Sequence, residues 1–194
     1  ARTIARTLAF HPRVIIDLLS VRRSVEADLV RGLAGRLAER DLVALDELAD
    51  RMRWRASRGQ SFPAEDGEFH RRIAAASGNL VALALVDLYW AIKAALYDGG
   101  LAHLDPKDAP SVAAAHGRLV DALRRGDGEL AGHVLRAHHE ESERRFTAWL
   151  AAHDEGATDG VNSAVAATIQ AALLWPGTEH GSSRDLLGNG TGAT

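Results

Sequence analysis

The amino-acid sequence predicts an all-α protein, an antiparallel bundle of six to seven helices. Three observations support this fold class. Apolar residues recur at steps of three and four along most of the chain, which is the spacing of one helix face. Alanine, leucine, arginine and glutamate, all good helix formers, dominate the composition. The β-branched residues do not gather into alternating runs, so strands are not favoured.

The first two helices are expected at residues 12–38 and 42–58. In the first, Pro12 suits an initial helical turn. Its stripe of residues at steps of three and four is apolar except for two charged members, Arg22 and Glu26. The second helix is expected to be capped by Asp41 and to stop near a glycine.

The third helix is expected after Ser61, ending at Gly78, and Asn79 then caps a fourth at residues 80–98. This fourth helix is apolar on most sides, so we expect it to be buried on several faces. Two further helices are expected, and a short amphipathic segment would form a seventh. Their ranges are 111–125, 128–152 and 161–175.

Composition limits the class of function. The chain has 194 residues, 46% of them hydrophobic and 25% charged, as in one soluble domain with its own core. A net charge of −3 argues against direct nucleic-acid binding by this chain. There is no cysteine, which excludes disulfides and thiolate metal ligands. No apolar run reaches the roughly 18 residues of a membrane span, and we expect a cytoplasmic protein that does not bind membranes.

Polar residues with the chemistry of metal ligands lie on three of the expected helices. Asp66 and His70 are four residues apart, so they share one helix face. His116 lies 11 residues before Asp127 and His138 lies 11 residues after it, so a hairpin folded there brings the two histidines level. His138 falls at the edge of its apolar stripe, whereas the following histidine is turned away by about 100°.

Two interpretations of these four residues stay open on spacing alone. Each histidine could be hydrogen-bonded separately within the core, or the four could share one divalent metal that relieves the cost of burying them together. Histidine and carboxylate ligands without sulfur suit Zn²⁺, our first choice, with Ni²⁺, Mn²⁺ or Fe²⁺ as alternatives.

Five segments carry a resemblance to a known family. Over about residues 12–150 the chain resembles the effector-binding domain, called FCD, of FadR-type GntR transcription regulators. The segments are "LLSVRRSVEADLV" (18–30), "DLVALDELADRM" (41–52), "EDGEFHRRIAAASGNLV" (65–81), "HGRLVDALRRGD" (116–127) and "ELAGHVLRAHH" (129–139).

The resemblance implies a site and its ligands. In metal-binding members of the family, one aspartate and three histidines hold a divalent metal whose open positions accept a small carboxylate effector. The matching positions here are Asp66, His70, His116 and His138. Arg22 and Asn79 match positions expected to contact the effector, although helix capping also explains Asn79.

The implied function is that of a ligand-sensing regulatory domain, without enzymatic activity or catalytic residues. Binding of an organic acid would modulate DNA binding by a homodimeric full-length regulator. DNA contact would come from a winged helix-turn-helix domain, which does not precede the bundle in this sequence. We therefore expect a lead-in at 1–11, the FCD-type bundle at 12–153, and a linker and tail at 154–194.

Two other functions remain as alternatives. A metal with open positions can activate water, as in a metal-dependent hydrolase. However, Glu68 on the metal-bearing helix is turned by about 160° from His70, so a general base is lacking. The other alternative is a helical interaction module whose histidines are structural.

Overall fold

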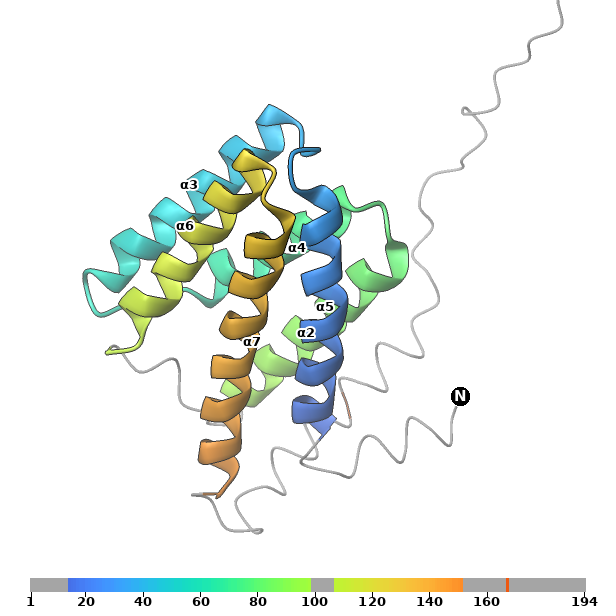
Figure 1. Ribbon diagram of the computed structural model, residues 1–194. Coiled ribbons are helices and arrows are strands. Elements are labelled where there is room, and N and C mark those ends of the chain that lie inside the picture. The colour runs from blue at the N-terminus through green and yellow to red at the C-terminus, as the bar shows by residue number, and fades with distance from the viewer. Residues whose placement is uncertain (1–13, 99–106, 152–166, 168–194) are drawn as a thin grey trace, which may run out of the picture.

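A computed structural model describes residues 14–98, 107–151 and 167. The described part contains six α-helices and no strand, so the all-α prediction is confirmed (Figure 1). The expected segment 161–175 lies almost wholly outside the described residues. The helices are α2 (Val14–Leu33), α3 (Glu39–Ala56), α4 (Pro63–Ala76), α5 (Leu80–Asp98), α6 (Ala109–Arg125) and α7 (Gly128–Ala151).

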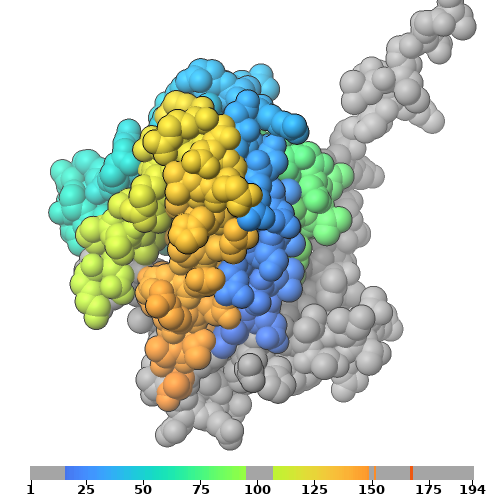
Figure 2. All heavy atoms as spheres, in the orientation of Figure 1, coloured from blue at the N-terminus to red at the C-terminus, as the bar shows by residue number. Residues whose placement is uncertain are grey.

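The first and last of these helices lie side by side. Figures 1 and 2 show α2 and α7 packed along each other over the face in view. Beside them, α3 packs against both α6 and α4, and α4 in turn packs against α5. Helix α4, which carries Asp66 and His70, therefore has α2, α3 and α5 as its neighbours.

The hairpin of α6 and α7 forms as expected. Gly126 ends α6 in the left-handed conformation, with φ of 73°, and Asp127 caps α7 by accepting a hydrogen bond from Leu130 N–H at 2.9 Å. Gly35, also left-handed, packs on this turn, and its N–H donates to the Leu123 carbonyl at 2.9 Å. A Cβ atom on Gly35 would lie 3.2 Å from the Gly126 Cα atom, so this close approach favours glycine.

The hydrophobic core reaches the histidines directly. The ring of Phe69, fully buried, meets the ring of His116 edge-on at 4.7 Å between centroids and that of His70 at 6.0 Å. Burial of apolar surface stabilises such a core by roughly 25 cal/mol per Å². The polar cluster thus has an apolar wall. Other fully buried core residues include Leu45, Met52, Ile73, Leu119, Leu123 and Leu135.

Some predicted details are wrong. Asp41 does not cap α3, because the helix begins at Glu39 and Ala38 takes the N-cap position without a side-chain bond. The carbonyl of Ala38 already accepts the first helical hydrogen bonds, and Asp41 lies within the first turn. The first helix ends at Leu33, since Gly35 turns the chain.

Over residues 80–94, whose side chains the structure describes, helix α5 buries one stripe rather than several faces. Its buried residues are spaced at three and four, and Leu80 and Val81 at its start are 79% and 71% exposed. Within the described residues, no helix is both long enough and apolar enough to cross a membrane. The buried stripe is Ala82, Val86, Tyr89 and Ile92.

Replacing Asn79 by alanine should lower the free energy of unfolding by about 1 kcal/mol. The Asn79 Oδ1 atom accepts hydrogen bonds from the N–H groups of Val81 and Ala82, both at 3.0 Å, and alanine leaves these donors without a protein acceptor. Chemical denaturation measures the effect. Asn79→Asp should keep most of the stability, and equal losses for the two variants would contradict the capping role.

Candidate metal centre

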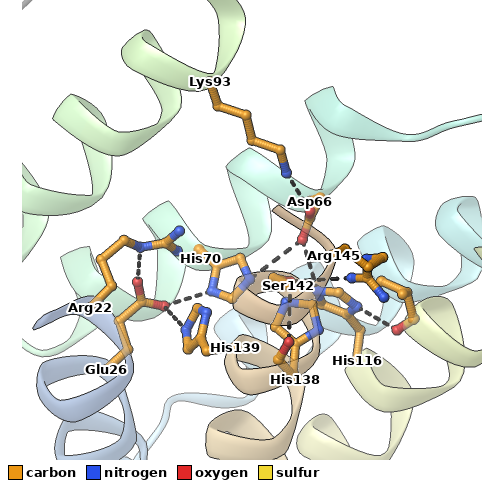
Figure 3. A network of polar contacts seen from close by, with 11 residues as sticks. Arg22, Glu26, Asp66, His70, Lys93, His116, His138, His139, Ser142 and Arg145 are labelled. Carbon is orange, nitrogen blue, oxygen red and sulfur yellow. Dashed lines mark hydrogen bonds and ion pairs between the residues drawn. The ribbon is translucent and has the colours of Figure 1, made fainter. Parts of the chain in front are cut away.

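Four side chains from three helices meet inside the bundle. Asp66 and His70 come from α4, His116 from α6 and His138 from α7, and one ligand atom from each lies within 4.8 Å of all the others (Figure 3). Opposite ligands of a metal with bonds of about 2.1 Å are about 4.2 Å apart, so small side-chain rotations would close the four around an ion. The structure thus brings together the residues singled out from sequence, and their role as ligands stays a prediction.

His116 is oriented by the backbone of its own helix. Its Nδ1 atom lies 2.9 Å from the Val112 carbonyl oxygen, which can only accept, so Nδ1 carries a proton. Its Nε2 atom lies 3.0 Å from Asp66 Oδ1. Nε2 is therefore the nitrogen that His116 can offer to a metal.

His70 is oriented by a carboxylate from another helix. Its Nδ1 atom lies 2.6 Å from Glu26 Oε2, and its Nε2 atom lies 3.4 Å from Asp66 Oδ1. Burial alone would lower the pKa of His70, but the charges and hydrogen bonds of Glu26 and Asp66 outweigh it and raise the pKa. A carboxylate–histidine pair of this kind fixes the ring and makes the opposite nitrogen a better metal ligand.

Glu26, which the sequence analysis did not select, organises this part of the site. Its side chain is 1% exposed, and it lies 2.5 Å from Arg22 Nε through Oε1. Burial alone would raise the pKa of Glu26, but Arg22, His70 and His139 outweigh burial and hold it well below its ordinary value. The carboxylate is therefore ionised in the protein interior.

His138 completes the cluster from α7. Its ring centroid is 4.7 Å from that of His116 and 5.3 Å from that of His70. Burial and the neighbouring imidazoles hold the pKa of His138 well below its ordinary value, so its ring is neutral at neutral pH. The neutral form is the one that binds metals. Among the described residues, no hydrogen bond involves either ring nitrogen of His138.

The two oxygens of Asp66 face different partners. Oδ1 faces the histidines, whereas Oδ2 lies 3.5 Å from the Nζ atom of Lys93 on α5. Burial alone would raise the pKa of Asp66, but Lys93 and the hydrogen bonds from His116 and His70 hold it well below its ordinary value. An ionised carboxylate thus faces imidazole rings, and carboxylate and imidazole donors together suit a borderline divalent ion.

Arg22, which was selected because it matches a family position expected to contact the effector, lies beside the cluster. It is 2% exposed, its guanidinium stacks on the Tyr89 ring with Cζ 3.9 Å from the centroid, and its second terminal nitrogen, Nη2, is buried without a hydrogen bond. Asn79, by contrast, is exposed and occupied in capping α5. A direct role of either residue in effector binding stays a prediction.

The sequence predicted that His139 turns away from the cluster. In the structure its side chain is nevertheless buried, with 1% of its surface exposed. It turns away from His138 but toward α2, where its Nε2 atom lies 3.4 Å from Glu26 Oε2. Burial lowers its pKa to about 4. Glu26, His70 and His139 form a second, adjoining group of possible ligands, but the guanidinium of Arg22 on the same carboxylate opposes a cation there.

Glu68, considered above as a general base, lies in an ion pair with an arginine, and so does Glu141 on α7. Glu68 pairs with Arg72 at 2.7 Å and is 42% exposed. Glu141 pairs with Arg145 at 3.1 Å. Neither contact directs these carboxylates toward the cluster, and for Glu68 this agrees with the orientation inferred from helix geometry.

Comparison with known families agrees with this fold. The model of the FCD domain family matches residues 17–141. The chain therefore belongs to the FCD family, the effector-binding domains of FadR-type GntR regulators. Domains of this class bind small-molecule effectors and are regulatory rather than typically catalytic. Searches of curated proteins and of solved structures gave no match.

Replacing Glu26 by glutamine should weaken binding of Zn²⁺ by about 10–100-fold, the usual effect of losing a carboxylate behind a metal-binding histidine. Glutamine keeps the shape but removes the charge that orients and polarises His70. Titration against a competing chelator measures the affinity. Glu47→Gln, at a carboxylate that is 64% exposed on α3, is the matched control. Equal affinities of the two variants would contradict this role of Glu26.

Proposed function

We propose that this domain senses a small organic acid through a divalent metal held by Asp66, His70, His116 and His138. The observation that carries the proposal is the convergence of four ligand atoms within 4.8 Å inside an FCD bundle. The two fixed imidazoles, each with Nδ1 engaged and Nε2 turned to the cluster, support it further. Zn²⁺ is the first candidate, and Ni²⁺, Mn²⁺ and Fe²⁺ suit the same ligands.

The effector would be a small carboxylate. When bound, the metal supplies Lewis acidity and open positions for a carboxylate oxygen. Arg22 would hold the acid from the side of α2, because a planar guanidinium binds carboxylates with parallel hydrogen bonds and its Nη2 atom is buried without an acceptor. The protein would thus recognise the acid group by two cationic centres at once.

Binding would be transmitted through the helices that meet at the site. An effector contacting Arg22 and the metal ties α2 to α4, α6 and α7. In a homodimer, this would favour one arrangement of the two subunits, with a coupling free energy of about 1–3 kcal/mol. A winged helix-turn-helix domain of the full-length regulator would convert that arrangement into altered DNA binding. The sensing unit would comprise residues 12–153, with 1–11 and 154–194 outside it.

Calorimetric titration of metal-loaded and metal-stripped protein with lactate and acetate tests this function. The loaded protein should bind a small carboxylate and the stripped protein should not. Arg22→Lys should weaken binding by about tenfold or more while metal content stays unchanged, since lysine keeps the charge opposite Glu26 but loses the guanidinium fork.

Arg58→Lys is the matched control for this titration. Arg58 also stacks on an aromatic ring, with Cζ 3.9 Å from the Trp54 centroid, but it is exposed. Its substitution should leave carboxylate binding unchanged. Carboxylate binding that survives metal removal, or that Arg22→Lys does not weaken, would contradict the proposed role of the site.

A further inference from the structure

Helix α5 has two unlike sides. Its buried stripe packs on α2 and α4, the helices that carry Arg22 and Asp66. Its opposite side faces solvent, and the neighbouring side chains of Leu80 and Val81 at its start are 79% and 71% exposed. Large apolar side chains that are exposed together, unlike single ones, are typical of an interaction surface.

The exposed stripe of α5 has the spacing of a helix–helix interface. Its members follow one another at alternating steps of four and three residues, and all of them are exposed. A strict alternation of this kind repeats every 3.5 residues, which is the period of a seam between two packed helices. The small side chains in the stripe would let a second helix approach closely. The stripe consists of Leu80, Ala84, Asp87, Ala91 and Ala94.

This stripe is complementary to itself. If two copies of α5 pack antiparallel about a twofold axis near residue 85, Leu80 lies opposite Ala91 of the partner subunit. Ala84 then lies opposite Asp87 of the partner subunit, so that the two aspartates do not face each other. A twofold interface uses the same surface on both copies, and a stripe in which the large residue meets a small one meets that requirement.

The charged groups at this face are matched in sign. Asp87 pairs with Arg71 on α4, with Oδ1 and Nε 2.8 Å apart, and the two side chains are 46% and 55% exposed. Two copies can therefore approach without a surplus of like charge between them. The stripe alone, about 21 Å of helix, is small for a stable interface, which buries roughly 800 Å² on each partner. Helix α4 widens the face, since Ala75 is exposed one turn from Arg71.

The inner side of the same helix contacts the site. The guanidinium of Arg22 stacks on the ring of Tyr89. The ring of Trp90 packs on Gly67, the residue after Asp66, so closely that a Cβ atom on this glycine would lie 3.1 Å from it. Because α5 is packed on both helices, an effector that shifts α2 or α4 would also shift the outer face of α5.

We propose that the outer face of α5, extended by Arg71 and Ala75 of α4, is the surface at which two copies of this chain meet. The inference rests on the proposed function for the role of the dimer, since that function requires a homodimer and leaves its interface open. It assigns the contact between subunits to α5, which supplies none of the four metal ligands.

Disulfide cross-linking of the full chain tests this geometry, because the chain has no cysteine of its own. In the double variant Leu80→Cys/Ala91→Cys, the two thiols of one chain lie about 16 Å apart along the helix, too far for a disulfide. Two copies packed as proposed bring each thiol against the other position of the partner subunit. Oxidation should therefore convert most of the protein into a covalent dimer.

The matched control is Val43→Cys/Trp54→Cys on α3. These residues have the same spacing along their helix and are 45% and 55% exposed. The control should stay monomeric on a denaturing gel after oxidation. A double variant on α5 that cross-links no more than this control would overturn the proposal.

Ala84→Glu tests the strength of the interface. Glutamate is a good helix former, but here it adds a charge to the stripe opposite Asp87 of the partner subunit. Sedimentation should show a dimer dissociation constant that rises by about tenfold or more. Val43→Glu, at an exposed apolar position on α3, should leave this constant unchanged. A dimer that Ala84→Glu does not weaken would overturn the inference.

Metal content and titration with lactate, measured on the same samples, separate this inference from the proposed function. Both should be retained in Ala84→Glu, because one chain supplies the whole site. A monomeric wild type in which Leu80→Cys resists labelling by a maleimide would mean that another segment, such as 161–175, covers the face. That result would overturn the interface and leave metal and acid binding standing. A wild-type dimer that cross-links as proposed but binds neither metal nor acid would have the opposite meaning.

Discussion

The ionised carboxylate of Glu26, buried in the core, is the interaction on which the site depends. An unpaired carboxylate would be unstable there, and Glu26 is held by partners from three helices: Arg22 on its own α2, His70 on α4 and His139 on α7. Removing one partner of a buried pair typically costs about 3–5 kcal/mol. Pairing of the Glu26 carboxylate therefore links α2 and α7, the first and last of the six helices, to α4.

The same constraint prepares the cluster for a ligand. Because Glu26 accepts the Nδ1 proton of His70, the Nε2 atom of that ring turns toward Asp66, His116 and His138. Well-packed apolar residues would often stabilise such an interior as well as a polar network does, so this concentration of buried charge is more easily explained by binding than by stability. Arg22, on α2 beside Glu26, would let a ligand of the metal also contact the helix that the carboxylate anchors.

Helical periodicity was sufficient to predict the fold class, and the symmetry of the α6–α7 hairpin was sufficient to bring His116 and His138 together. Contacts of α2 were harder to foresee, because Glu26 meets His70 across 44 residues of sequence and the rotation of α2 about its axis is set by packing. The signal was present in the apolar stripe of the first helix, where Arg22 and Glu26 are charged and one turn apart. His139 was missed because turning away from His138 brings it onto Glu26, an outcome that only the position of α2 decides.

Metal content is the most direct test of the central claim, measured by mass spectrometry on the purified protein together with melting temperature before and after chelation. The account predicts about one divalent metal per chain and a melting temperature that falls on chelation, since a ligand of the native state stabilises it. His116→Ala should lose most of the metal. A protein without metal that takes up no added Zn²⁺, Ni²⁺ or Mn²⁺, and whose melting temperature is insensitive to chelator, would contradict the account.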